Sequence, residues 1–144
     1  MLKKIHAFLN ANKSQDSTVP DDTVAIACLL CEVANADHSI SEEEATALQN
    51  TLCKLLQIDN DKAKELLSIA KETIRTSNSL FQFTSELRAL DQQSRIDLIS
   101  AMWEIAYADN HLDPHEEAII RRVAQLIYVA HSEFIRTKLA VIAP

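Results

Sequence analysis

Six carboxylates in this chain occur as two sets with identical spacing, 72 residues apart. They are Glu32, Asp37 and Glu44 in the first set and Glu104, Asp109 and Glu116 in the second. Carboxylate oxygens are the ligands that hard divalent cations such as Ca²⁺ and Mg²⁺ prefer in proteins. Each set is therefore a candidate metal site.

A structural role is available for most of these acids. Positions five apart on a helix lie about 140° apart around its axis, so Glu32 and Asp37 do not share a face while the helix persists. Asp37 and Asp109 can instead accept backbone N–H groups of the turn that follows, and Glu44 and Glu116 can serve helix caps. The structural reading is favoured, and a Ca²⁺ or Mg²⁺ site is the alternative.

The acids belong to a longer repeat, in which residues 34–44 match residues 106–116 without a gap. Each copy reads as a helix end, a tight acidic turn and the start of a second helix, which predicts two helix-turn-helix units. The one apolar residue in each turn, Ile40 or Leu112, is expected to enter the core. Ser41 with Glu44 forms a capping box, and Asp113 before a proline is a strong helix start.

Glu32 and Glu104 have no evident capping role. On a helical wheel Glu32 shares a face with Ala25, Leu29 and Ala36, and Glu104 shares one with Asp97, Ala101 and Ala108. Small side chains permit close helix approach, so a carboxylate on such a face is expected to be partly buried and to need a partner, such as a backbone N–H or an arginine. Arg95, Arg121 and Arg122 are the candidate arginines. We expect any functional centre to lie between the two helices that carry Glu32 and Glu104.

Every patterned segment of the chain is helical. Apolar spacing predicts helices at about residues 2–12, 21–35, 42–56, 61–75, 79–89, 91–106, 114–127 and 133–141, the last one capped by Ser132. The prediction is an all-α, single-domain bundle of about seven to eight helices with two pseudo-symmetric repeats. Residues 1–20 are expected to be an N-terminal helix and linker, and residues 21–144 the helical domain.

The composition excludes several classes of function. The 144 residues contain no glycine, so the chain lacks the Rossmann fingerprint, the P-loop, the nucleophile elbow and the standard EF-hand. No apolar run is long enough for a membrane span, and no secretory signal is evident, so a cytoplasmic location is expected. The net charge of −7, with ten acids against Lys54 alone between residues 16 and 61, disfavours nucleic acid and favours cations or a basic partner surface.

No residue set points to catalysis. Cys28, Cys31 and Cys53 read as free thiols, with Cys28 and Cys31 in an apolar helical stretch. His111 and His115 flank the second turn, but the chain has no HExxH motif, and no serine or cysteine has a discernible general base. The chain is expected not to be an enzyme.

The repeated pattern Ala-x-Ala-Asp-x-x-(Ile/Leu)-x-x-x-Glu, together with the last helix opening His131-Ser132-Glu133-Phe134, resembles the bacterial tellurite-resistance TerB-like family over about residues 21–141. The same module occurs at the N-terminus of some membrane-anchored DnaJ-like co-chaperones. The resemblance implies a helical, pseudo-symmetric bundle that can bind divalent metal through the six acids named above. It also implies work in cytoplasmic stress-response or membrane-associated complexes. The family often has Asp-Gly in the turn, where this chain has Asp37-His38 and Asp109-Asn110.

The leading hypothesis is a non-enzymatic TerB-like module that binds another protein, with a possible divalent cation at the acidic turns. One alternative is a metal-dependent enzyme that uses the same carboxylates with His111 and His115. The other is an oligomerising scaffold. Metal-dependent hydrolysis that is lost in Glu104→Gln would favour the enzyme, and light scattering would reveal the scaffold.

Overall fold

The computed structural model describes residues 22–35, 40–76 and 80–143, and this part of the chain contains seven α-helices and no strand. The helices are α2 (Asp22–Ala34), α3 (Glu42–Leu56), α4 (Asn60–Arg75), α5 (Leu80–Leu87), α6 (Gln92–Ala106), α7 (Pro114–Leu126) and α8 (His131–Ile142). The all-α prediction is confirmed. The predicted helix at residues 2–12 and the linker that follows it lie outside the described residues.

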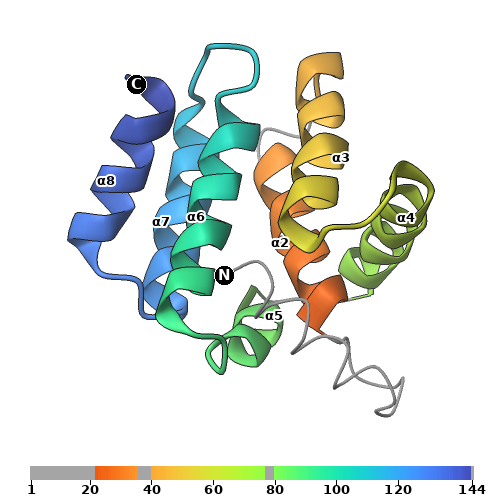
Figure 1. Ribbon diagram of the computed structural model, residues 1–144, viewed down its shortest axis with the longest axis horizontal. Coiled ribbons are helices and arrows are strands. Elements are labelled where there is room, and N and C mark those ends of the chain that lie inside the picture. The colour runs from red at the N-terminus through yellow and green to blue at the C-terminus, as the bar shows by residue number, and fades with distance from the viewer. Residues whose placement is uncertain (1–21, 36–39, 77–79, 144) are drawn as a thin grey trace.

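Two helices, α2 and α6, lie at the centre of the bundle (Figure 1). Helix α4 packs on α2, α8 packs on α6, and α3 packs against both α6 and α4. The short α5 contacts α2 and α7 at the lower end in the view of Figure 1. The central place of α2 follows from its sequence, because Thr23–Ala34 is apolar around nearly the whole helix, and a helix of that kind must be buried on all sides.

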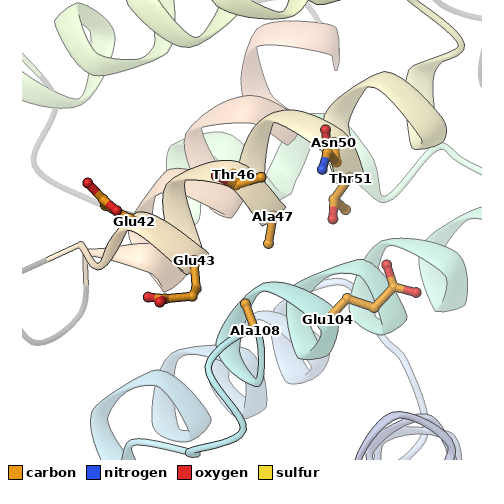
Figure 2. Close-up of a pocket in the computed structure, with 8 residues that line it drawn as sticks. All are labelled: Glu42, Glu43, Thr46, Ala47, Asn50, Thr51, Glu104 and Ala108. Carbon is orange, nitrogen blue, oxygen red and sulfur yellow. The ribbon is translucent and has the colours of Figure 1, made fainter.

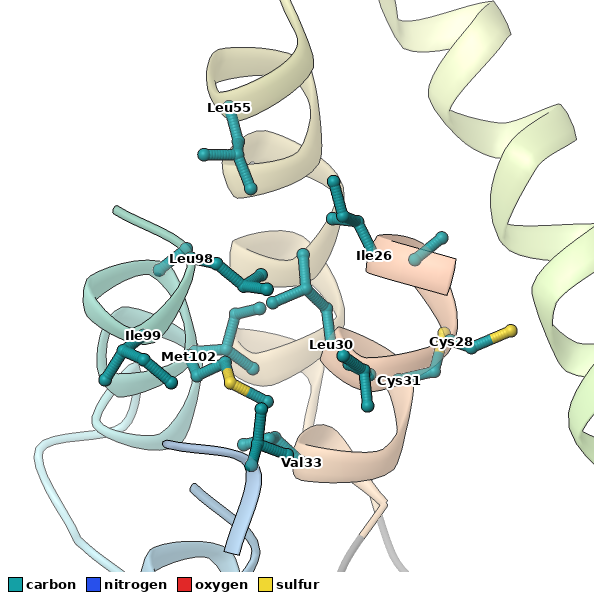
Figure 3. Close-up of a cluster of buried hydrophobic side chains, with 14 of the residues drawn as sticks. Ile26, Cys28, Leu30, Cys31, Val33, Leu55, Leu98, Ile99 and Met102 are labelled. Atoms are coloured by element: carbon teal, nitrogen blue, oxygen red, sulfur yellow. The ribbon is translucent and has the colours of Figure 1, made fainter. Parts of the chain in front are cut away.

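The core between α2, α3 and α6 is built from large aliphatic side chains (Figure 3). Leu30 of α2, Leu52 of α3 and Met102 of α6 are each at most 2% exposed. Burying one such side chain contributes about 1.5–3 kcal/mol relative to leaving it in water. The contact between the three helices therefore holds α3 and α6 side by side, and this placement matters for the site below.

Side-chain caps fix the helix starts where the sequence predicts them. Ser41 Oγ accepts the backbone N–H of Glu44 at 3.0 Å, and Glu44 Oε1 accepts the N–H of Ser41 at 3.1 Å, which confirms the capping box. Asp91 caps α6 by accepting the N–H of Ser94 at 2.8 Å. Asp59 caps α4, so that helix begins at Asn60, one residue before the predicted start.

The predicted cap of α8 is wrong. The helix begins at His131, its N-cap is Ala130, and no side chain caps it. The ring of His131 stacks on that of Phe134, with centroids 5.6 Å apart, and Phe134 is buried against Trp103 of α6. Burial of Phe134 therefore sets where α8 starts, and Ser132 lies exposed inside its first turn.

The carboxyl end of α7 is closed without glycine. Tyr128 takes a left-handed backbone with φ of 62°, a conformation in which glycine is the usual residue. Two arginines bind the last carbonyls of this end, Arg88 Nε to Leu126 O at 2.8 Å and Arg95 to Ile127 O at 2.7 Å. These bonds attach α7 to α6 and to the segment after α5.

The helix boundaries agree with the sequence repeat. Helices α2 and α6 end at Ala34 and Ala106, and helices α3 and α7 begin at Glu42 and Pro114, each pair 72 residues apart. The two sequence copies correspond to helices α2–α4 and helices α6–α8. In each set the last helix packs on the first, α4 on α2 and α8 on α6. The repeat as an internal symmetry of the three-dimensional structure stays a prediction.

Candidate functional site

The second acidic turn has the local structure that its sequence predicts. Asp109 Oδ1 accepts the backbone N–H of His111 at 3.0 Å, and Asn110 between them is left-handed with φ of 63°. This is the hydrogen-bonded turn that aspartate forms with the residue two positions on. Asp109 therefore orders the chain between α6 and α7. Its counterpart Asp37 lies outside the described residues.

The apolar residues of the two turns differ in their environment. Leu112 is partly buried and packs against the core, as predicted. Ile40 is 38% exposed, so its predicted insertion into the core is wrong. The neighbouring capping box of Ser41 and Glu44 fixes the start of α3 through backbone hydrogen bonds, and this device does not need a buried Ile40.

The acids at the two helix starts are engaged locally or buried. Glu44 is 5% exposed and holds the N–H of Ser41, which commits one of its oxygens to the cap. At α7, Asp113 Oδ1 accepts the backbone N–H of His115 at 2.7 Å and lies 3.2 Å from its Nδ1. The backbone bond from His115 is the main cause that lowers the pKa of Asp113. Glu116, at the third helical position, is 3% exposed.

Glu32 and Glu104 lie in different surroundings, although they match in the repeat. The residues that share the face of Glu32, Ala25 and Leu29, are fully buried, and burial raises the pKa of Glu32. Glu104 points to the side of α6 that faces α3, and its Oε1 lies 3.6 Å from Nζ of Lys54. Glu104 thus faces α3, and the expected centre between the helices of Glu32 and Glu104 stays a prediction.

Among the described residues, Glu104 forms its ion pair with Lys54 of α3, and not with one of the arginines that the sequence offered as partners. Arg95 binds the carbonyl of Ile127, and Arg121 pairs with Glu117 at 3.8 Å. The partner of Glu104 comes from a helix that only the tertiary structure brings near.

The described residues contain no group of three His, Cys, Asp or Glu side chains placed to hold a metal ion. Glu104, Asp109 and Glu116 are all described, and the structure does not gather them into such a group. Of the first set only Glu32 and Glu44 can be placed, since Asp37 lies outside the described residues. The metal site at the acidic turns stays a prediction.

Calorimetric titration checks that prediction. If the turns bind Ca²⁺ or Mg²⁺, the wild-type chain releases or absorbs saturable heat, and Asp37→Asn/Asp109→Asn loses it, because each change removes a charged ligand oxygen. The matched control is Asp59→Asn/Asp91→Asn, which removes two helix-cap carboxylates outside the turns. Equal heats in the two double variants would exclude the turns as the site.

A groove runs between α3 and α6 and contains Glu104. One end has a volume of about 620 Å³ and is lined by Glu42, Glu43, Thr46, Ala47, Glu104 and Ala108, among others. The other end has about 220 Å³ and is lined by Lys54, Leu55, Asp97, Ser100 and Ala101. Thr51 and Glu104 line both hollows, so the two hollows adjoin along the gap between α3 and α6, and together they are called the α3–α6 groove. Figure 2 shows Ala47 pointing from α3 toward Ala108, with Glu43 and Glu104 placed along the same gap.

The groove exists because small side chains line it. Alanine, serine and threonine on both helices leave space that leucine would fill, while the core on the other side of α3 and α6 keeps the two helices in contact. Acids come from both walls, and Lys54 supplies one positive charge. Asp97 accepts a hydrogen bond from Gln93 at 2.9 Å, and the exposed pair of Lys54 with Glu104 is weak because water screens it.

The sequence signal for this groove was partly visible. Asp97, Ala101 and Ala108 were expected to share a face with Glu104, and all of them line the groove. The α3 wall was missed, because Glu43, Thr46, Ala47 and Lys54 are ordinary residues for an exposed helix face.

None of the seven described helices combines the length and apolar character that crossing a bilayer requires.

Comparison with known proteins identifies the relatives of this fold. No curated protein matches the chain. A crystal structure of a protein of unknown function, PG1108 from Porphyromonas gingivalis W83, is similar with a TM-score of 0.62 at 17% sequence identity. The match covers 83% of this chain and 94% of that one, and it shows a shared fold. The family model described as tellurite resistance protein TerB matches residues 23–139, so the chain belongs to the TerB family.

Proposed function

We propose that this TerB-family chain is a non-enzymatic protein-interaction module that receives a partner in the α3–α6 groove. The observation that carries the proposal is the groove itself, where small side chains leave open space between two helices that the core holds together. Most surfaces between packed helices are filled by side chains. An unfilled groove with charged walls offers a partner contact area, and its charges fix the orientation in which the partner binds.

The form of the groove favours a protein segment over a small substrate. Its two ends share residues and extend along α3 from Glu42 to Leu55, a distance of about 20 Å at the rise of an α-helix. Small-molecule sites are typically concave pockets that enclose their ligand, whereas this groove is open along its length. The family description, tellurite resistance protein TerB, supports a bacterial complex of the tellurite-resistance type as its setting. A membrane-associated complex is the alternative setting that the resemblance to the co-chaperone module implies.

The proposal is tested by filling the groove. A photo-crosslinking residue at Asn50, which lines the groove, would identify the partner in bacterial cells, and the partner would then be purified. Ala47→Trp is expected to weaken its binding at least about tenfold, roughly 1.4 kcal/mol, because the indole occupies the space of the partner. Ala45→Trp, at an exposed position on the same helix outside the groove, is the matched control. Titration calorimetry measures both.

Equal affinity of the two tryptophan variants would contradict the proposal, since the partner would then bind elsewhere. Thermal unfolding followed by circular dichroism verifies that both variants keep the fold. Loss of binding in Ala47→Trp alone, with both variants folded, would establish the groove as the docking surface.

A further inference from the structure

We infer that the occupant of the groove is a cationic amphipathic α-helix of the partner protein, with lysine or arginine on both flanks and small or apolar side chains on the face between them. This inference rests on the proposed function and specifies the chemistry of the partner. It follows from three properties of the groove, which are its length, its small side chains and the placement of its charges.

The length and lining of the groove fit a helix. About 20 Å corresponds to roughly 13–14 residues of α-helix, or nearly four turns. The short side chains of Ala47, Ala101 and Ala108 line the groove and project little into it. Small residues at a helix interface let a third helix approach closely. Leu55 adds an apolar contact at one end. A helix that lies between α3 and α6 would cover these side chains with its own apolar face.

The charges of the groove fit a cation on each flank of that helix. Glu42 and Glu43 come from the α3 wall, and Asp97 and Glu104 come from the α6 wall. The chain already places one ammonium group here, because Nζ of Lys54 lies 3.6 Å from Glu104. The side chain of Lys54 is 72% exposed, so a lysine or arginine of the partner can displace it at small cost. The net charge of −7 attracts a basic segment over a longer range.

The test uses synthetic peptides and the full chain. The probe is a 14-residue helical peptide with an alanine and leucine face flanked by lysines, and the matched peptides carry glutamate in place of every lysine or a central proline. Fluorescence anisotropy measures their affinities, and amide chemical shifts locate the contact. The lysine peptide is expected to bind at least tenfold more tightly than either matched peptide, with shifts concentrated on α3 and α6.

Charge reversal within the groove gives the decisive comparison. Glu43→Lys/Glu104→Lys is expected to weaken binding of the lysine peptide about tenfold or more, because both walls lose an acid and gain a base. Glu65→Lys/Glu72→Lys makes the same change of charge on exposed positions of α4, and it should leave the affinity nearly unchanged. Because the two double variants change the net charge of the chain equally, a difference between their affinities reports the effect of the groove charges alone.

Three results would overturn the inference. They are equal weakening by the two charge reversals, equal binding of the proline and lysine peptides, and shifts that lie outside α3 and α6. None of these results would remove the groove as a docking surface, since the tryptophan variants test that proposal with the natural partner. A partner that fails to distinguish Ala47→Trp from Ala45→Trp would instead refute the proposed function.

Discussion

Replacing Trp103 by alanine is expected to lower the free energy of unfolding by about 3–5 kcal/mol, the range found when a large buried aromatic is truncated. Trp103 of α6 is fully buried, and its ring centroid lies 5.1 Å from that of Phe134 on α8. Alanine would leave a cavity between the two helices. Because the chain has one tryptophan, urea unfolding should be followed by far-ultraviolet circular dichroism.

Tyr128→Ala is the control for this variant. Tyr128 is also aromatic but is 66% exposed, and the guanidinium carbon of Arg88 lies 5.0 Å from its ring centroid. An exposed cation–π contact contributes about 0.5–1 kcal/mol, so Tyr128→Ala is expected to lose less than about 1 kcal/mol. Similar unfolding midpoints for the two variants would show that Trp103 does not anchor α8 to α6.

The helices and most of their starts could be predicted from the sequence because these features are local. Ser41 with Glu44, Asp91 and Asp113 each bind a backbone N–H within three residues, and such contacts need nothing from the rest of the fold. The same holds for Asp109 in its turn. The predicted Ser132 cap is wrong because the start of α8 is not set locally. Burial of Phe134 against Trp103 overrides the weak local preference for a serine cap.

Only the α6 wall of the groove could be predicted from the sequence. A helical wheel places Asp97, Ala101 and Ala108 with Glu104, but it cannot show which helix lies opposite that face. In α2 the matching face, with Ala25 and Leu29, is buried inside the bundle. Identical positions in a repeat can therefore have different environments, because the helices that cover the two copies are not equally placed. Pairing between α3 and α6 depends on core contacts that are distant in sequence.

Alkaline pH is expected to destabilise the fold through two buried thiols. Burial is the main cause that raises the pKa of Cys28 to about 12 and that of Cys31 to about 11, from an ordinary value of 9.0. Below pH 9 both states keep these protons, so the thiols leave stability unchanged. Above pH 9 the unfolded chain releases them and the folded chain does not, so stability falls by about 1.4 kcal/mol per pH unit for each thiol.

Between pH 9 and pH 11 the two thiols together are expected to remove about 4 kcal/mol, because the folded state retains most of both protons over that range. Urea unfolding at pH 7, 9, 10 and 11 measures the loss, and Cys28→Ala/Cys31→Ala separates it from the titration of lysine and tyrosine. The stability of the double variant should fall less steeply above pH 9, by the amount that the thiols contribute. Helix α4 covers Cys28, whose Sγ lies 3.7 Å from the carbonyl oxygen of Ala70. If the stability of the variant and of the wild type fell in parallel with pH, α4 would not exclude water from these thiols.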